Sequence, residues 1–332
     1  MNGESGKRVV LGVDIGATTA KMGYIDCEGK CLSEGASVAT GAQQAADVFF
    51  KRLYESAEAL RATLPPGYEL AGIGIGAANG NYYKGTIECS PNLGWDYVNV
   101  RAELGKYYNV PVAVTNDANA AALGEMLFGA ARGMRDFISI TLGTGLGSGI
   151  VANGEMIYGA DGFAGELGHT IVDPNGRECA CGRLGCLETY CSATGICRTV
   201  EELICNTTIP SELRNISYRE LTAAKISEAA GGGDALAAAA FEACGETLGR
   251  KLSDSVAHLS PEAIILCGGM AAAGELILAP TRRSLEKYVF PIYRGKVKVL
   301  TSSLPEGNVA VLGAAALAWN TLKGTANKER NL

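Results

Sequence analysis

The amino-acid sequence predicts an α/β protein with two domains that share one architecture. Three observations support this prediction: the length of 332 residues, the repeated order of apolar strand, loop and helix, and two glycine-rich loops. A chain of this length fits two domains of roughly 150 residues each. Strand–loop–helix repetition is typical of α/β architecture. With 47% hydrophobic and 19% charged residues, the chain can build a sizeable core in each domain.

The two glycine-rich loops lie in segments 8–21 and 137–149, and each follows an apolar run. Glycine lets the backbone approach a phosphate closely, and the N–H groups of such a turn form an anion-binding nest. Two loops about 130 residues apart indicate a duplicated domain that holds one polyphosphate from both sides of a cleft. The alternative is a pair of ordinary hairpin turns.

The strands expected along the chain are short apolar runs, and several end in turn residues. They are Arg8–Asp14, Ala20–Asp26, Ala71–Ile75, Val112–Thr115, Asp136–Leu142, Ala263–Cys267 and Lys296–Thr301.

Helices are expected where apolar residues recur at helical spacing or alanine is abundant. They are residues 43–64 before a Pro-Pro pair, Ala118–Gly129, a long helix from the cap Asp234 to Leu259, and Gly313–Leu322. We expect Asn206–Ser217 to form a loop and Lys323–Leu332 to form a frayed tail.

Composition also restricts the partners and the compartment. The formal net charge is −6 and the isoelectric point about 5.2, so we expect no nucleic-acid partner. The polar start, Met1 to Lys7, does not resemble a signal segment. An apolar run of about 20 residues, the length needed to span a bilayer, is absent from the sequence. We therefore expect a cytoplasmic protein without a membrane partner.

A histidine and three cysteines cluster within a short stretch of this chain, which has eleven cysteines in all. His169, Cys179, Cys181 and Cys186 match the ligand set of a tetrahedral zinc site. Four protein ligands leave no open position, so the metal would shape its loop and take no part in chemistry. The alternative is a redox pair or a chance grouping of thiols.

Three carboxylates are candidates for catalysis and binding. Asp117 follows a strand end, where α/β sheets place ligands, and it could accept a proton from an attacking hydroxyl. The alternative for Asn116-Asp117 is a helix N-cap. Glu166 and Glu188 flank the cysteine cluster and could bind vicinal hydroxyls of a sugar, or they could be solvated surface residues.

Five motifs together resemble the ROK family, whose members are bacterial sugar kinases and sugar-responsive repressors. They occur in the family's order and span most of the chain. They are Asp14-Ile15-Gly16-x-Thr18-x2-Lys21, Asn116-Asp117-Ala118-Asn119, Thr141-Leu142-Gly143-Thr144-Gly145-x-Gly147, Glu166-x-Gly168-His169 and Cys179-x-Cys181-Gly182-x2-Gly185-Cys186-x-Glu188.

The resemblance implies the two-domain, actin-like ATPase (ribonuclease H-like) α/β fold, with a cleft between the domains. Residues 1–117 would form the smaller N-terminal α/β domain, which the C-terminal helix, about 313–332, would join. Residues 118–312 would form the larger α/β domain with the zinc-binding loop. A homodimer or homotetramer is expected.

The resemblance also implies a role for each matching residue. Asp117 resembles the catalytic base, and the zinc ligands would be His169, Cys179, Cys181 and Cys186. The sugar contacts would be Asn92, Asn116, Glu166, His169 and Glu188. Asp14 would hold the Mg²⁺ ion. The full set of residues that bind the nucleotide and its metal ion would be Asp14, Gly16, Thr18, Lys21, Thr144, Gly145, Gly268 and Gly269.

Three positions depart from the family pattern. Ala17 replaces a glycine in the first loop, which would crowd the approach of a phosphate if its φ were positive. The stretch Gly74–Gly80 lacks a Pro-Gly pair that lines the sugar pocket, and Gly268-Gly269-Met270 has two glycines where three are common.

The function implied is the ATP-dependent phosphorylation of a hexose, with Mg²⁺ and a structural Zn²⁺. Glucose, converted to glucose 6-phosphate, is the first choice. Fructose, N-acetylglucosamine and N-acetylmannosamine stay open as substrates, and so does a sugar-binding regulator without catalysis. A repressor is not expected, because the first glycine loop begins at Gly12 and leaves no room for a preceding DNA-binding domain.

Overall fold

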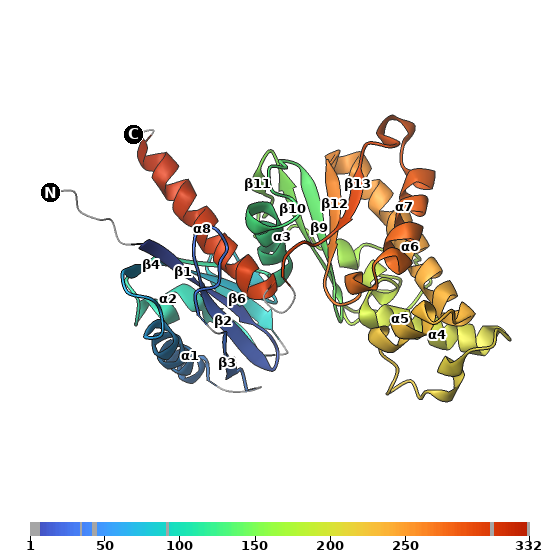
Figure 1. Ribbon diagram of the computed structural model, residues 1–332, viewed down its shortest axis with the longest axis horizontal. Helices are drawn as coiled ribbons and strands as arrows, with labels where there is room; N and C mark the ends of the chain where they lie inside the picture. Colours follow the sequence, from blue (N-terminus) through green and yellow to red (C-terminus); the bar gives the residue numbers. More distant parts are fainter. Residues whose placement is uncertain (1–6, 34, 42–44, 91–92, 306–308, 331–332) are drawn as a thin grey trace. The chain divides into compact units, whose positions relative to one another are not determined.

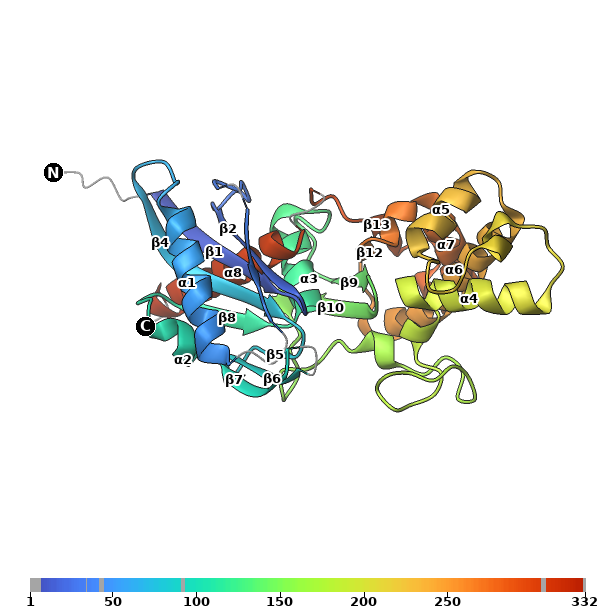
Figure 2. The same ribbon diagram turned by 90° about the horizontal axis from the view of Figure 1, so that it is seen from below.

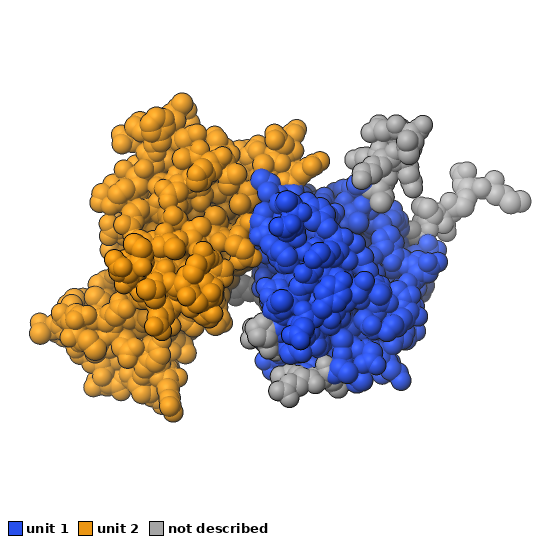
Figure 3. Space-filling view, turned by 180° about the vertical axis from the view of Figure 1, so that it is seen from behind, with its two compact units in different colours: residues 1–133, 156–164, 303–332 blue, residues 134–155, 165–302 orange. Residues whose placement is uncertain are grey.

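The computed structural model describes residues 7–33, 35–41, 45–90, 93–305 and 309–330, the last six of these as helical backbone. The chain divides into two compact units (Figure 3). Unit 1 comprises residues 1–133, 156–164 and 303–332, and unit 2 comprises residues 134–155 and 165–302. The first boundary therefore falls after residue 133, whereas the sequence placed it at residue 117.

Unit 1 contains the elements β1 to β8, α1 to α3 and α8, which are labelled in Figure 1 or Figure 2. Their bounds are β1 Lys7–Ile15, β2 Thr19–Ile25, β3 Ala36–Ala39, α1 Ala46–Arg61, β4 Tyr68–Ala77, β5 Gly80–Asn81, β6 Thr86–Ser90, β7 Trp95–Asn99, α2 Val100–Gly105, β8 Val112–Thr115, α3 Asp117–Phe128 and α8 Val309–Arg330.

The remaining elements belong to unit 2, apart from the last residue of β11. They are β9 Phe137–Leu142, β10 Leu146–Ala152, β11 Glu155–Met156, α4 Ala193–Asn206, α5 Ala223–Gly231, α6 Ala235–Leu259, β12 Ala263–Cys267, α7 Glu275–Tyr288 and β13 Lys298–Thr301. Short 3-10 turns lie at Leu167–His169, Leu187–Thr189, Glu212–Asn215, Ala271–Ala273 and Pro291–Tyr293.

Two five-stranded sheets have the same topology. The strand order is β3-β2-β1-β4-β8 in one and β11-β10-β9-β12-β13 in the other. In each sheet an antiparallel hairpin, β1–β2 or β9–β10, is followed by two parallel strands. A third sheet, β5-β6-β7, lies in unit 1. The repeated topology agrees with the duplication that the two glycine-rich loops predict.

Strand β1 reads as a continuous apolar run because both faces of its sheet are covered. Val9, Leu11 and Val13 belong to the core that α1 completes, whereas Val10 packs into the core that includes residues of α8. Successive residues of a strand point to opposite faces, so the run supplies both cores. Figure 2 shows α1 and α8 on opposite faces of this sheet.

Helix α8 approaches β1 and β4 so closely that glycine is required beneath it. A Cβ on Gly74 would overlap the backbone oxygen of Ala314, and one on Gly12 would overlap Val311 O and Ala315 N. On the other side of the helix, a Cβ on Gly313 would overlap the backbone of Ala120 in α3. These glycines let α8 pack in unit 1 against both the sheet and α3.

The structure bears out the expected strands with small shifts of their ends, and the expected cap of α6. Asp234 Oδ1 accepts a hydrogen bond from Ala237 N at 2.9 Å. The prediction of a frayed tail was wrong up to Arg330, because α8 continues to that residue. No proline interrupts this stretch, and its alanine, lysine, glutamate and arginine residues favour a helix. Among the residues described, no helix combines the length and apolar character that a membrane span requires.

The close packing of α8 predicts that Gly74→Ala destabilises the protein. The added methyl must displace α8 or β4, and overpacking of this kind costs about 1–3 kcal/mol. Gly105→Ala is the control, because a Cβ there meets nothing within 4 Å and the residue lies at the end of α2. Urea unfolding of both variants checks the prediction. A Gly74→Ala protein as stable as the wild type would contradict the packing described here.

Candidate active site and metal centre

The carboxyl ends of three parallel strands bring two aspartates of unit 1 together. In the sheet register Asp14 of β1 lies beside Gly76 of β4, which lies beside Thr115 of β8. Asn116 and Asp117 follow Thr115 directly. A Cβ on Gly76 would lie 3.9 Å from Asp117 Cα and 4.0 Å from Asp14 Oδ1. A small residue therefore separates the two carboxylates at the edge where α/β sheets place ligands.

Asn116 takes the capping role at the start of α3. Its Oδ1 accepts a hydrogen bond from Asn119 N at 2.6 Å. Asp117 is the first helical residue, and its Oδ1 accepts from Ala118 N at 2.8 Å. The N-cap alternative is thus correct for Asn116, and it leaves the Asp117 carboxylate for another role.

Burial raises the pKa of both aspartates, and the negative charge of Asp117 raises that of Asp14 further. The pKa of the Asp14 carboxyl is raised from 3.8 to about 6, first by burial and then by the negative charge of Asp117, while Lys21 lowers it. Lys21 is the partner of Asp14 in the β1–β2 hairpin. Burial also raises the pKa of Asp117 above its ordinary value, and the backbone N–H of Ala118 opposes this rise. A pair of close carboxylates of this kind is typical of a functional site.

The first glycine-rich loop is the turn between β1 and β2. Gly16 N donates to Thr19 O at 3.1 Å, and Thr40 holds the outside of the turn through Thr18 O and Ala17 O. Ala17 has no positive φ. The departure at Ala17 therefore does not strain the backbone, and alanine fits this turn as glycine would.

The second glycine-rich loop joins β9 and β10 in unit 2. Gly143 N donates to Gly145 O at 3.0 Å, and the start of α4 binds the loop through Ala193 N to Gly143 O at 2.8 Å. Thr194 Oγ1 donates to Thr144 O at 2.8 Å. Gly268 has a φ of 90°, and a Cβ there would overlap the backbone of Leu142. The Gly268-Gly269 turn thus packs at the base of this loop.

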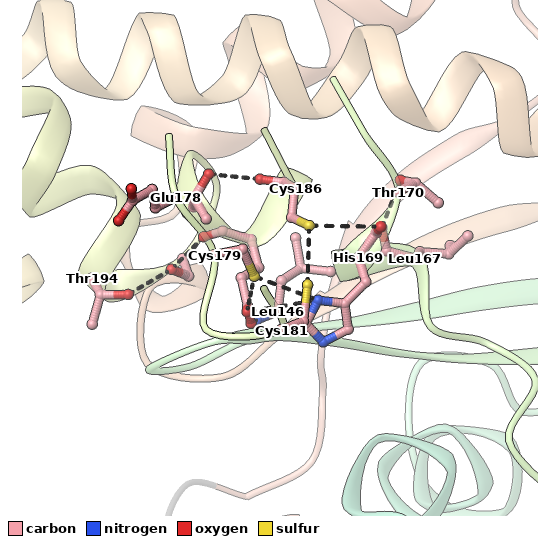
Figure 4. Close-up of polar contacts among 12 residues, drawn as sticks. Leu146, Leu167, His169, Thr170, Glu178, Cys179, Cys181, Cys186 and Thr194 are labelled. Carbon is pink, nitrogen blue, oxygen red and sulfur yellow. Dashed lines mark hydrogen bonds and ion pairs between the residues drawn. The ribbon is translucent and has the colours of Figure 1, made fainter. Parts of the chain in front are cut away.

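The predicted metal ligands lie together (Figure 4). A ring nitrogen of His169 and the three thiol sulfurs are all within 4.8 Å of one another. Cys181 Sγ lies 3.6 Å from Cys186 Sγ, and Cys179 Sγ lies 3.7 Å from His169 Nδ1. A tetrahedral zinc ion with bonds of about 2.3 Å to sulfur and 2.0–2.1 Å to nitrogen sets its ligand atoms roughly 3.5–3.8 Å apart. Donor types and spacing therefore fit zinc.

The carboxylate of Glu188 lies between the metal cluster and the second glycine-rich loop. Its Oε2 accepts from Leu146 N at 3.2 Å, and its Oε1 lies 3.4 Å from Cys179 Sγ and 3.9 Å from His169 Nδ1. A Cβ on Gly145 would lie only 2.5 Å from Glu188 Oε2. Gly145 thus leaves room for this carboxylate, which would have to shift if residue 145 carried a side chain.

The segment with Glu166 and His169 is held against β10. Ser148 Oγ donates to Gly165 O, and Leu167 N donates to Ser148 Oγ at 3.3 Å. A Cβ on Gly168 would overlap Leu146 O. Glu166, which is exposed, directly precedes the 3-10 turn Leu167–His169. The contacts with β10 therefore determine the position of this turn.

The predicted site residues thus form two groups, one in each unit, and Asn92 lies outside the described residues. The group in unit 1 is Asp14, Gly16, Thr18, Lys21, Asn116 and Asp117. The group in unit 2 is Thr144, Gly145, Glu166, His169, Cys179, Cys181, Cys186, Glu188, Gly268 and Gly269. Sequence reasoning missed Gly76 and Thr194. A glycine directly after the strand run at residues 71–75 and a Ser-x-Thr at a helix start were the available signals.

The sequence profile of the ROK family matches residues 10–321. The chain belongs to the ROK family. It is 36% identical over 299 residues to the glucokinase of Halalkalibacterium halodurans, covering 86% of this chain and 87% of that protein. It is 33% identical over 322 residues to the glucokinase of Thermotoga maritima, covering 96% and 99%.

A solved structure extends this similarity within the ROK family. It is that of a ROK family glucokinase from Streptomyces griseus in complex with glucose and AMPPNP, which is 35% identical to this chain. The TM-score is 0.78, and the match covers 94% of this chain and 99% of that one. The expected actin-like ATPase fold of the ROK chain is confirmed by this likeness.

The raised pKa of Asp14 predicts a pH-dependent cost to folding. The folded-state pKa of about 6 lies above the ordinary 3.8, so the stability that Asp14 contributes is present below about pH 4 and is lost as the pH rises through 6. Asp14→Asn removes this loss. In urea titrations, the free energy of unfolding of the variant minus that of the wild type should therefore increase from pH 4.5 to pH 7. A difference that stays constant over this interval would rule out a raised pKa at Asp14.

Proposed function

We propose that this ROK family protein is an ATP-dependent glucokinase, which converts glucose to glucose 6-phosphate. The observation that carries the proposal is the position of Asp117, at the first turn of α3 and beside Asp14 at the carboxyl edge of the sheet. Glucokinases that are 33% and 36% identical to the chain over most of its length support glucose as the substrate.

Asp117 is proposed as the general base. Its carboxylate accepts the proton of the glucose O6 hydroxyl as that oxygen attacks the γ-phosphorus of ATP. The bond from this phosphorus to the oxygen of the β-phosphate breaks, and ADP leaves. A raised pKa suits a group that must hold this proton. Asp14 would hold the Mg²⁺ ion on the nucleotide side, and Mg²⁺ supplies charge stabilisation at the transferring phosphate.

The proposed sugar contacts are argued from the position of each side chain within its own unit. Asn116 uses its Oδ1 to cap α3, so its amide nitrogen would donate to a hydroxyl. His169 turns Nδ1 toward the cysteines, so its Nε2 would face the sugar. The full proposed set of sugar contacts is Asn92, Asn116, Glu166, His169 and Glu188.

The nucleotide is proposed to bind at the two glycine-rich turns. Backbone N–H groups around Gly16, Thr18, Thr144 and Gly145 would contact the phosphates. Lys21 would add positive charge near Asp14, its hairpin partner. Gly268 and Gly269 would lie on the adenosine side, where Gly268 packs against the end of β9.

A structural zinc ion is proposed at His169, Cys179, Cys181 and Cys186. These four residues complete a tetrahedral site, so the ion would order the loop that ends at Glu188. Thiolate ligands require a reducing compartment, which supports a cytoplasmic location for the protein. We also propose a homodimer or homotetramer, in line with the family resemblance.

The alternative substrates are fructose, N-acetylglucosamine and N-acetylmannosamine, and the alternative function is a regulator without catalysis. A regulator without catalysis would be favoured if Ala17 kept a phosphate away from the first glycine-rich loop, and the absence of a positive φ at Ala17 argues against this. ADP release over a panel of these sugars and glucose distinguishes the alternatives. Glucose should give the highest kcat/KM.

In the same assay Asp117→Asn should lower kcat by at least about 100-fold, because the amide cannot accept the proton, and should leave the affinity for glucose largely unchanged. Asp47→Asn is the matched control, since Asp47 also accepts the N–H of the next residue at a helix start, at 2.9 Å from Val48 N. Near-normal turnover by Asp117→Asn would remove Asp117 from its role.

A further inference from the structure

Arg177 lies in the loop that carries the three cysteine ligands, two residues before Cys179. Its side chain is only 10% exposed, although it lies in a turn-rich loop and arginine side chains are mostly exposed. The metal cluster does not use it, and no motif of the sequence pointed to it. A nearly buried guanidinium must find acceptors within the protein, since unpaired buried charge is costly.

All five N–H donors of this guanidinium have an acceptor. Nε donates to Glu202 Oε1 at 2.8 Å, and Nη2 donates to Glu202 Oε2 at 2.6 Å and to Thr199 Oγ1 at 2.9 Å. Nη1 donates to two backbone oxygens, Thr189 O at 2.6 Å and Gly195 O at 3.1 Å. The guanidinium also stacks on the ring of Tyr190, 4.4 Å from its centroid.

The backbone of Arg177 binds the same surroundings. Its N–H donates to Tyr190 Oη at 3.1 Å, and its carbonyl accepts from Gly185 N at 2.7 Å. A Cβ on Gly176 would overlap Tyr190 Oη, so the chain comes as close to this ring as glycine allows. One residue therefore joins both ends of the cysteine loop to the protein beneath it.

The partners of Arg177 are the elements that position Glu188. Thr189 follows Glu188 in the 3-10 turn Leu187–Thr189, and Thr189 Oγ1 donates to Cys186 O at 2.7 Å. Gly195 lies in the first turn of α4, whose cap Ser192 donates to Glu188 O at 2.7 Å. Through these contacts the guanidinium reaches the turn between the last cysteine ligand and the start of α4.

We propose that Arg177 is a positioning residue, which holds the cysteine loop and Glu188 in their binding geometry independently of the metal. The proposal rests on the zinc site proposed above. Because the loop is held in advance, zinc binding needs less ordering of the chain and the affinity for zinc is higher. The same contacts keep Glu188 in place beside the second glycine-rich loop.

Lysine cannot replace this arginine. An ammonium group has three donors and no planar fork, so it cannot serve Glu202, Thr199 and the two carbonyls together. Arg177→Lys keeps the charge and removes the geometry. Arg198→Lys is the matched control. Arg198 lies in α4, the helix that carries Thr199 and Glu202, and it donates a hydrogen bond to the cysteine loop at Glu178 O, at 2.9 Å.

The test is a zinc titration of stripped full-length protein against a chromophoric chelator in reducing buffer, with thermal melting and glucose kinetics on the same samples. Arg177→Lys should weaken zinc binding by about 10–100-fold, the range for residues that support metal ligands. It should also raise KM for glucose more than it lowers kcat. Arg198→Lys should match the wild type in all three measurements.

The outcomes separate the possible failures. An Arg177→Lys protein with a lower melting temperature but unchanged zinc affinity and KM would make Arg177 merely structural and overturn the proposal. If this variant does not fold, Glu202→Gln decides: zinc affinity weakened by about threefold or more supports the proposal, and an unchanged value overturns it. A wild-type protein that takes up no zinc would overturn the metal site itself, together with this inference.

Discussion

The carboxylate of Glu188 is the contact on which the functional loops of unit 2 depend. It accepts the N–H of Leu146 at the start of β10 and lies against Cys179 and His169 of the metal cluster. Residue 145 lacks a side chain, which leaves room for this carboxylate beside the second glycine-rich loop. Gly145, which the family resemblance assigns to phosphate binding, therefore also has a steric role, since a side chain there would crowd the carboxylate of Glu188. The proposed phosphate turn and the proposed sugar contacts thereby share one support.

A metal ion fits this arrangement as an organiser of the chain. The regular structure of the cysteine loop is limited to isolated β-bridges, and its backbone hydrogen bonds, such as that from Val172 N to Gly185 O at 2.8 Å, join one part of the loop to another. Four ligands from positions up to 17 residues apart would close that loop around one ion, and the closing of a loop by a metal contributes directly to folding. Arg177 supplies a second, metal-independent attachment of the same loop to α4. In the sequence, Glu188 lies between the last metal ligand and the start of α4, so both attachments hold the chain around it.

The sequence predicted β1 and β4 of one sheet, β9 and β12 of the other, and the members of the metal cluster, for two physical reasons. Strands such as β1 and β12 are buried on both faces, so they read as unbroken apolar runs. The metal ligands lie close together in the sequence, so their spacing alone indicates a site. The short strands β5 to β7 were missed because two to five residues give no clear alternation.

Other features depend on contacts that no local pattern contains. Arg177 and Glu202 are 25 residues apart and meet only because α4 packs beneath the cysteine loop. The sign of φ at Ala17 is set in the folded turn, where Thr40 Oγ1 donates to Ala17 O, and residue type alone left it open. Asn116 and Asp117 are both good capping residues, so only the folded chain shows which of them caps α3.

The most direct test of the account is X-ray absorption spectroscopy at the zinc edge on protein purified under reducing conditions. The account predicts about one zinc per chain with three sulfur ligands at about 2.3 Å and one nitrogen ligand at about 2.0–2.1 Å, unchanged when glucose is added. An absence of zinc, or a shell dominated by oxygen, would contradict it, because the loop that carries Glu188 would then have another organiser.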